Sequence, residues 1–281
     1  MYFCALMNNS RMEISVIIST YNAKEWLEKV LWGYNVQTYT NFEMVIADDG
    51  SREDTRELIE RFKEVSNYPI THVWHEDRGF QKSAILNKAI LACKTPYIIM
   101  SDGDCIPKKD FVEVHHRERE QGRFLSGGYF KLPLTISKAI TEEDVEKQNC
   151  FHIDWLLERG LKKSFKNNKL TATGWKEKFL NAVTPTRPTW NGHNASGWTK
   201  DILEVRGLDE RMQYGGQDRE LGERLVNLGI KGKQIRYSAI VIHLDHPRGY
   251  ANKESWAKNY AIRKETRSKK IKQTSYGIKR G

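Results

Sequence analysis

The sequence predicts an α/β fold in which helices flank a mostly parallel, Rossmann-like central sheet. Short apolar runs rich in β-branched residues alternate with segments of helical period through roughly the first hundred residues. Such alternation is typical of right-handed βαβ units, which make consecutive strands parallel. A chain of 281 residues with 39% hydrophobic content can bury a substantial core. The ligand crevice of such a sheet lies at the carboxyl ends of its strands.

Each predicted strand of the first half is an apolar run that ends at turn-forming or acidic residues. The first, 14–19, reads ISVIIS, and the helix after it places Trp26, Leu27, Val30 and Tyr34 on one face. The remaining strands and helices are predicted from the same two patterns, apolar runs and helical spacing. The predicted strands are 14–19, 42–47, 70–74 and 97–100, and the predicted helices are 24–38, 53–65 and 82–93.

The second half has a weaker pattern. Residues 135–185 show no clear period. They are expected to hold helices that form a smaller subregion beside the ligand crevice. The other predicted elements of this half are helices at 109–121 and 217–228 and strands at 123–131 and 238–242.

The charge of the chain is concentrated at its C-terminus. The formal net charge is +10, but residues 253–281 alone carry ten basic and two acidic side chains, which leaves +2 for the rest. A nearly neutral body argues against a nucleic-acid binder. We expect the basic tail, which includes Trp256 and Tyr260, either to contact an anionic membrane surface or to be a solvated, partly frayed end.

Cysteine usage and hydropathy bear on the location of the protein. Cys4, Cys93, Cys105 and Cys150 form no C-x-x-C pair, which favours neither a zinc site nor a disulfide framework. The first twenty residues lack an unbroken apolar stretch, and eighteen apolar residues never run together. We therefore expect a cytoplasmic protein, soluble or peripheral to the membrane.

Three carboxylates follow apolar strands directly. Asp49, Asp102 and Asp104 come after the second and fourth predicted strands, so we expect them to project into one crevice. A carboxylate there can accept hydrogen bonds from a nucleobase or ribose, and an Asp-x-Asp pair can hold a divalent cation through oxygen ligands. Gly103 between the aspartates permits a tight turn that lets the backbone approach a diphosphate.

The first predicted strand and the segments around Asp49, Asp102 and Asp104 together resemble the opening of glycosyltransferase family two, a large inverting family with the GT-A fold. The resemblance covers about residues 14 to 130 and implies that Tyr21 and Asp49 hold a uracil base, with Asp102 near the ribose and Asp104 on the metal. It also places Ser19, Thr20 and Asn22 at the nucleotide-sugar. The motifs that carry it are Ile17-Ile18-Ser19-Thr20-Tyr21-Asn22, Ala47-Asp48-Asp49-Gly50-Ser51 and Ser101-Asp102-Gly103-Asp104.

A second resemblance concerns the galactosyltransferase-type C-terminal region of animal β-1,4-galactosyltransferases and bacterial chondroitin-polymerase-like enzymes. Residues 79–87 (GFQKSAILN) resemble that group's phosphate-contacting helix start, with Lys82 where an arginine often stands. Residues 214–218 (YGGQD) resemble its W-G-G-E-D segment, which implies that Gly215, Gly216 and Gln217 contact the donor. Ile242-His243 resembles the strand end whose histidine completes the metal shell.

The residues themselves give these later segments two readings each. Gly215 and Gly216 let the backbone approach a sugar and set Asp218 in the first turn of a helix, where it could take a proton from an acceptor hydroxyl or simply cap the helix. His243 could ligate the metal or be a buried histidine satisfied by a neighbour. Ligation by carboxylate and imidazole favours Mn²⁺ over Mg²⁺.

Two positions depart from the galactosyltransferase pattern. Gln217 stands where that group has a glutamate, and Arg219 where it has an acid that contacts the acceptor, so donor and acceptor preferences do not carry over. Residues 191–198 resemble the stretch that lines the donor-sugar side. Trp190 and Trp198 beside it could stack on sugar rings or pack in the core.

The expected function is a metal-dependent inverting transfer of a sugar from a UDP-sugar to a free or lipid-linked saccharide. We divide the chain into a GT-A domain over 1–252, with a nucleotide-sugar half at about 14–130 and an acceptor and catalytic half at about 131–252, and a tail at 253–281. Alternatives are a sugar-phosphate nucleotidyltransferase, for which residues 19–23 offer no Gly-rich, Arg-containing phosphate loop, and a noncatalytic carbohydrate-binding protein.

Overall fold

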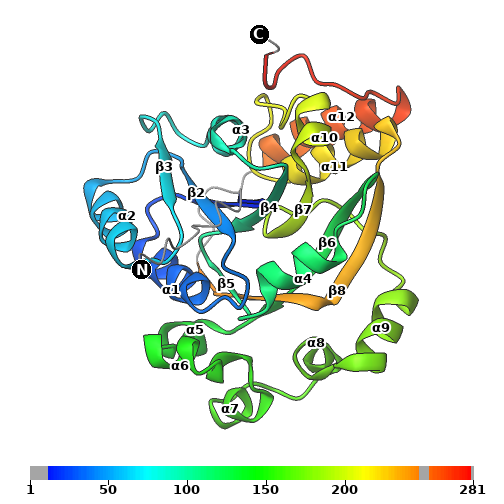
Figure 1. Ribbon diagram of the computed structural model, residues 1–281. Helices are drawn as coiled ribbons and strands as arrows, with labels where there is room; N and C mark the ends of the chain where they lie inside the picture. The colour runs from blue at the N-terminus through cyan, green and yellow to red at the C-terminus, as the bar shows by residue number, and fades with distance from the viewer. Residues whose placement is uncertain (1–11, 247–252, 280–281) are drawn as a thin grey trace, which may run out of the picture.

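The computed structural model describes residues 12–246 and 253–279 and builds them around an eight-stranded sheet (Figure 1). The strand order is β3-β2-β1-β4-β7-β6-β8-β5. The strands are β1 (Ile14–Thr20), β2 (Phe42–Asp48), β3 (Ile70–Trp74), β4 (Tyr97–Asp102), β5 (Cys105–Pro107), β6 (Arg123–Lys131), β7 (Asn194–Trp198) and β8 (Lys231–His243).

The first four strands form the parallel half of the sheet, as the sequence predicts. β1 pairs in parallel with both β2 and β4, and β2 with β3. The register aligns Ser19 with Asp102 and Thr20 with Asp48, so the polar ends of these strands meet at one edge. β7 enters the sheet antiparallel to β4 and β6, and β8 lies parallel to β6. The sequence analysis did not predict β7 because its residues, NASGW, contain no β-branched run.

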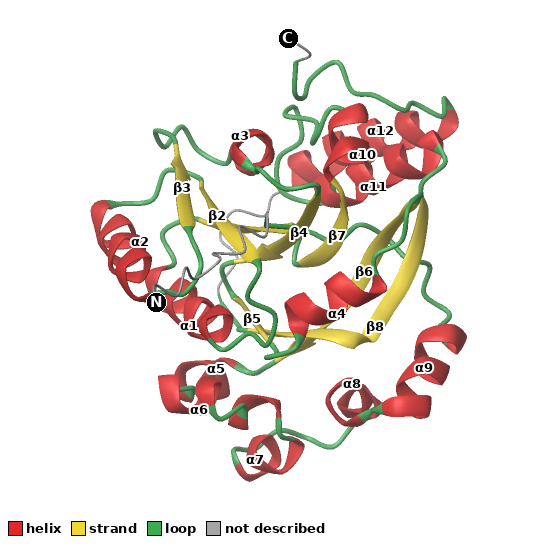
Figure 2. Cartoon of the chain, in the orientation of Figure 1, coloured by secondary structure: helices red, strands yellow, loops and turns green. Residues whose placement is uncertain are grey.

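Helices cover both faces of the sheet (Figure 2). Because side chains alternate along a strand, Val16 and Ile18 pack into one core while Ile17 packs into the other. The first core receives α1, α2 and α4, and the second receives α3, α10 and α11. The bounds are α1 (Lys24–Asn35), α2 (Glu53–Val65), α3 (Lys82–Ala92), α4 (Phe111–Glu118), α10 (Thr199–Glu204) and α11 (Gln217–Leu228).

The stretch without a clear period forms a row of short helices along the β8–β5 side of the sheet (Figure 1). α8 and α9 pack against β8, and α6 packs against α1. None of these helices exceeds ten residues, so their periodicity is too short to recognise in the sequence. They are α5 (Leu134–Ala139), α6 (Glu142–Glu146), α7 (Ile153–Glu158), α8 (Asn168–Thr171) and α9 (Gly174–Val183), with 3-10 turns at Asn149–Phe151 and Phe165–Asn167.

The basic segment forms helix α12 (Lys253–Ser268), which packs on α11. Ser255, Asn259, Ile262 and Thr266 are buried and fall on one helical face. The expectation of a solvated, frayed end is therefore wrong for 253–279. The buried face is mostly polar, which hides its period from a search for apolar residues. Among the helices of the described ranges, none combines the length and apolar character needed to cross a bilayer.

Candidate active site

A cavity of about 1190 Å³ opens where β1 and β4 end and α11 begins. Segments far apart in the chain contribute to its wall, as the parallel strand register requires. Every residue that the sequence analysis assigned to a site lines it: Ser19, Thr20, Tyr21, Asn22, Asp49, Lys82, Asp102, Asp104, Gly215, Gly216, Gln217, Asp218 and His243.

The loop after β1 presents Tyr21 to the cavity and uses Asn22 for internal support. The Tyr21 hydroxyl donates to Asp77 Oδ2 at 2.8 Å, and this hydrogen bond raises the pKa of Tyr21. The ring remains 46% exposed, so it is open to stacking. Asn22 adopts a φ of 46° and accepts a hydrogen bond from the Arg52 amide at 3.0 Å. Its side-chain oxygen therefore joins two loops, and Asn22 also lines the cavity.

Asp49 already has protein partners on both carboxylate oxygens. Oδ1 lies 2.7 Å from His75 Nε2, and Oδ2 accepts from the Gln81 amide at 3.0 Å. Burial raises the pKa of Asp49, and these two contacts oppose the rise. A nucleobase contact by Asp49 must therefore use the remaining lone pairs of a carboxylate that is fixed in place.

Lys82, at the start of α3, forms an ion pair with Asp102. Lys82 Nζ lies 2.7 Å from Asp102 Oδ1, and the Ser19 hydroxyl donates to the same oxygen at 2.7 Å. Burial opposes charge on both groups, but Asp102 raises the pKa of Lys82 and Lys82 lowers that of Asp102. Both groups are thus charged, and Lys82 must share or exchange its partner to contact a diphosphate.

Gly103 and Thr20 shape the floor beside this pair. A Cβ on Gly103 would lie 3.0 Å from the Ser19 carbonyl oxygen, which accepts a hydrogen bond from the Gly103 amide at 2.8 Å. Glycine at this position therefore serves close packing against β1. The Thr20 hydroxyl is buried and has no partner within the described part of the chain. It is a polar group available to a ligand.

Asp104, His243 and His246 form a compact cluster of potential metal ligands. One ligand atom from each lies within 4.8 Å of the others. Asp104 Oδ2 is 2.9 Å from His246 Nε2 and 3.7 Å from His243 Nε2. Burial works against ionisation of Asp104, but the two imidazoles hold its pKa well below the ordinary range.

The donor set of this cluster suits a divalent cation. His243 Nδ1 lies 2.7 Å from the Leu244 carbonyl oxygen, which can only accept, so Nδ1 carries the proton and Nε2 offers its lone pair. A carboxylate and two imidazoles favour ions such as Mn²⁺ or Zn²⁺ over Mg²⁺. The prediction of Asp104 and His243 on the metal fits this geometry, and His246 joins them.

The Gly215-Gly216 turn positions the start of α11. Both glycines have positive φ, 112° and 86°, which side-chain-bearing residues rarely adopt. Gln217 is buried, and its Oε1 accepts from the Gly215 amide at 3.0 Å. Gln217 thus stabilises the turn that carries the next residue, Asp218.

Asp218 is held by two backbone amides. Oδ2 accepts from Gly192 at 3.0 Å and Oδ1 from Arg219 at 2.8 Å. The N-cap residue of α11 is Gly216, and Asp218 satisfies a first-turn amide of the helix, that of Arg219. A carboxylate fixed at the cavity wall, with lone pairs left over, is suited to accept a proton from a bound hydroxyl.

Comparison with known proteins identifies a family match in the first half of the chain. Residues 15–128 match the family model described as glycosyl transferase family 2. The chain therefore contains a region, residues 15–128, that matches glycosyl transferase family 2.

The chain is similar to two curated synthases at low identity. It is 25% identical to the Escherichia coli chondroitin synthase over 83% of this chain and 35% of the relative. It is 27% identical to the Pasteurella multocida hyaluronan synthase over 85% of this chain and 25% of that protein. The chain thus spans about a third or less of the length of these two synthases.

Solved structures confirm the GT-A fold for the glycosyltransferase. A Pyrobaculum calidifontis mannosyltransferase in complex with GDP-Man and Mn²⁺ has a TM-score of 0.58 at 17% identity, over 95% of this chain and 66% of that one. TarS of S. aureus has a TM-score of 0.61 at 14% identity, over 92% and 41%. TarS 1-349 in complex with UDP-GlcNAc has 0.56 at 15%, over 85% and 60%.

Both tryptophans that were considered for sugar stacking pack against other aromatic rings. Trp190 is fully buried and packs on Phe124 with ring centroids 5.8 Å apart. Trp198 lies edge-on to Tyr97 at the amino end of β4, and its indole donates to the Glu120 carbonyl at 2.9 Å. Core packing therefore accounts for Trp190, and Trp198 lies at the end of β4 opposite to Asp102.

Three residues that line or support the cavity were not predicted from the sequence: His193, His246 and Asn259. His246 completes an H-x-x-H pattern with His243, a signal that the sequence offered. His193 lines the cavity edge-on to Tyr129, and burial lowers its pKa. Asn259 of α12 donates to the carbonyls of Gln213, Tyr214 and Gly215 at 2.9, 3.1 and 3.0 Å, which no local pattern indicates.

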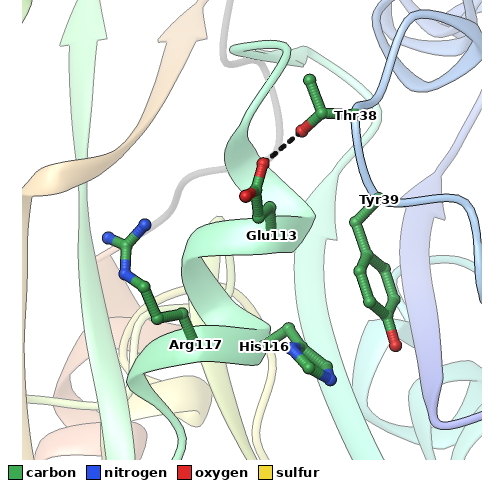
Figure 3. A pocket seen from close by; sticks show the side chains of 5 residues that line it. All are labelled: Thr38, Tyr39, Glu113, His116 and Arg117. Carbon is green, nitrogen blue, oxygen red and sulfur yellow. Dashed lines mark hydrogen bonds between the residues drawn. The ribbon is translucent and has the colours of Figure 1, made fainter.

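A second hollow is lined by Thr38, Tyr39, Glu113, His116 and Arg117 (Figure 3). The Thr38 hydroxyl donates to Glu113 Oε2 at 2.6 Å, as the dashed line in Figure 3 marks. His116 packs on Tyr39 with centroids 4.5 Å apart and lies 2.9 Å from Glu13, just before β1. These groups satisfy one another, and the hollow is remote from the carboxyl ends of the strands.

Proposed function

We propose that this chain transfers a hexose or N-acetylhexosamine from a UDP-sugar to a saccharide hydroxyl, with inversion, in polysaccharide, lipopolysaccharide or capsule biosynthesis. One observation carries the proposal: the cluster Asp104, His243 and His246 and the carboxylate of Asp218 line the same cavity. The relatives named as polysaccharide synthases and the UDP-GlcNAc complex of TarS 1-349 support a UDP-sugar donor.

The donor occupies the part of the cavity at the ends of β1, β2 and β4. Tyr21 and Asp49 flank the uracil, and Asp102 approaches the ribose, with Ser19 and Thr20 beside it. Lys82 supplies positive charge to the diphosphate. Asn22 shapes this wall indirectly through its contact with Arg52. Gly215, Gly216 and Gln217 contact the donor sugar.

The transfer step exchanges one bond at the anomeric carbon for another. Asp218 accepts the proton of the acceptor hydroxyl. The acceptor oxygen forms a bond to the anomeric carbon from the face opposite the nucleotide. The bond to the diphosphate oxygen breaks, and UDP leaves with the electron pair. Asp104, His243 and His246 would hold Mn²⁺ or Mg²⁺, which neutralises charge on the diphosphate. An α-linked donor then yields a β-linkage.

A screen of nucleotide-sugars tests the activity. We expect UDP release and mass-detected transfer from one of the UDP-sugars in the presence of Mn²⁺, and loss of both after addition of a chelator. A sugar-phosphate nucleotidyltransferase would instead form a nucleotide-sugar and diphosphate from a sugar phosphate and UTP. Absence of UDP release from all donors, with and without Mn²⁺, would favour a noncatalytic carbohydrate-binding protein.

Replacement of the proposed base separates chemistry from binding. Asp218→Asn should reduce kcat by at least a thousandfold, because the acceptor proton loses its recipient, while UDP affinity changes less than about threefold. Steady-state kinetics and calorimetry with UDP measure the two effects. Glu57→Gln, on the exposed face of α2, is the matched control. Collapse of UDP affinity in Asp218→Asn would show that Asp218 supports the structure and is not the base.

The proposal also includes a location and a division of the chain. We expect a cytoplasmic enzyme whose α12 can contact an anionic membrane through exposed Lys258, Tyr260 and Lys264. The division into 1–252 and 253–281, and the galactosyltransferase-type character of the second half, are likewise predictions. The hydrogen bonds from Asn259 to the Gly215 turn link α12 to the domain that precedes it.

A further inference from the structure

We propose that the cavity rim formed by α11 and α12 is an acceptor subsite for an acidic saccharide. Arg219 would bind a carboxylate or phosphate group of the acceptor, and Trp256 would support a sugar ring. The inference rests on the proposed function and adds to it a chemical class of acceptor and a contribution from the C-terminal helix.

The geometry of the cavity places the acceptor on this side. In the proposed function the cluster at Asp104 holds the metal and, through it, the diphosphate, and the proposed base, Asp218, lies at the start of α11. An acceptor hydroxyl must contact Asp218 from the open part of the cavity. The adjoining rim carries Arg219 and, from α12, Trp256 and Arg263, all of which line the same cavity.

Arg219 is the cation of this rim that is available to a ligand. Its side chain is exposed, and within residues 12–246 and 253–279 its guanidinium has no hydrogen-bond or ion-pair partner. Arg263, in contrast, donates to Glu223 at 2.6 Å. A planar guanidinium binds a carboxylate or phosphate through two parallel hydrogen bonds. Arg219 is the residue immediately after Asp218, so an anionic acceptor bound there brings its hydroxyls near the base.

Trp256 provides a fixed apolar surface in the wall of the cavity that Arg219 also lines. A Cβ on Gly215 would lie 3.0 Å from the indole, so the ring packs directly against this turn. Tyr214 contacts Trp256 at an interplanar angle of 86° and a centroid distance of 6.0 Å. Trp256 nevertheless stays 51% exposed. An aromatic ring held on one side and open on the other is suited to pack against the C–H face of a sugar.

Binding measurements with matched acceptors test the subsite without knowledge of the donor. The first pair is an oligosaccharide that ends in glucuronic acid and its carboxyl-reduced counterpart, which ends in glucose. The second pair is a sugar phosphate-terminated oligosaccharide and its dephosphorylated form. Affinities are measured by NMR or calorimetry with UDP and Mn²⁺ present. We expect the acidic member of at least one pair to bind tenfold or more tightly than its neutral partner, and the pair concerned identifies the anion.

Three variants assign the preference to the rim. Arg219→Gln should abolish the preference for the acidic member, and Trp256→Ala should weaken both members about tenfold. Lys264→Gln, an exposed cation of α12, is the control and should retain the preference. UDP affinity and donor hydrolysis should persist in all three.

Two outcomes overturn the inference: no acidic saccharide of the panel binds better than its neutral partner, or the preference survives Arg219→Gln. Failure of the proposed function has a different signature, since no UDP-sugar would then be hydrolysed or transferred, whatever the acceptor affinities.

Discussion

At the residue scale, the strand-end carboxylates were predictable and their partners were not. Asp49, Asp102 and Asp104 follow apolar strands, and a parallel sheet brings such positions together. His75, which contacts Asp49, and His246, which contacts Asp104, lie in irregular segments after strands. Irregular segments carry no period, so apart from the H-x-x-H spacing of His243 and His246 the sequence did not indicate where these side chains point.

His246 gives the sharpest test of the metal cluster. His246→Ala removes one of three potential ligands, and we expect the affinity for Mn²⁺ to fall at least tenfold, as much as loss of an outer partner of a ligand typically costs. Calorimetric titration with Mn²⁺ in the presence of UDP measures the change. His116→Ala, in the second hollow, is the control (Figure 3). Unchanged Mn²⁺ affinity in His246→Ala would exclude His246 from the metal shell.

At the element scale, the sequence located elements with strong apolar patterns and missed those with polar ones. The bounds of α2 (Glu53–Val65) and α11 (Gln217–Leu228) match the predicted 53–65 and 217–228. β7 and α12 were not predicted, since β7 lacks β-branched residues and α12 buries serine, asparagine and threonine. These polar faces are specified by partners distant in the sequence.

Helix α12 acts on the site through Asn259. Its amide donates to three successive carbonyls, those of Gln213, Tyr214 and Gly215, just before Asp218. Asn259→Ala should lower kcat by tenfold or more because the turn that positions Asp218 loosens, while the KM for the donor changes little. Steady-state kinetics and thermal unfolding measure catalysis and stability separately.

Asn227→Ala, in α11, is a matched control because Asn227 contacts the other end of α12. The Asn227 amide donates to the Thr266 and Ile271 carbonyls at 3.0 and 2.8 Å, so it anchors the same helix away from the catalytic turn. We expect both variants to lose similar stability, about 1–3 kcal/mol, and Asn259→Ala alone to lose activity. If Asn259→Ala and Asn227→Ala lost activity equally, the role of Asn259 would be purely structural.

At the scale of the whole molecule, a buried polar network joins α4 to the middle of the sheet. His115 Nε2 lies 3.0 Å from Asn194 Oδ1, and Asn194 Nδ2 donates to the Gly128 and Ala239 carbonyls at 2.7 and 3.0 Å. Because Asn194 Oδ1 can only accept, His115 Nε2 carries the proton and Nδ1 accepts from Ser196 Oγ at 2.7 Å. The network requires neutral His115.

This requirement makes global stability depend on pH. Burial lowers the pKa of His115 to about 4, and its partners, Ser196 and Asn194, are neutral. The unfolded chain, with a histidine pKa of about 6.5, binds the proton more readily than the folded chain. The contribution is therefore fully present above pH 6.5 and is lost as pH falls to about 4. Its full size is about 3 kcal/mol, at 1.36 kcal/mol per pKa unit.

Urea unfolding between pH 7.5 and 4.5 isolates this contribution when the wild-type chain is compared with His115→Gln. The variant should be less stable at pH 7.5, because glutamine cannot reproduce both hydrogen bonds. The difference in unfolding free energy between the two chains should narrow as the pH falls, because only the wild-type chain must keep this histidine unprotonated. His152 is exposed, and His152→Gln should keep the wild-type dependence of unfolding free energy on pH. A gap that stays constant from pH 7.5 to 4.5 would mean that His115 titrates alike in folded and unfolded chains, and the network would then tolerate the imidazolium form.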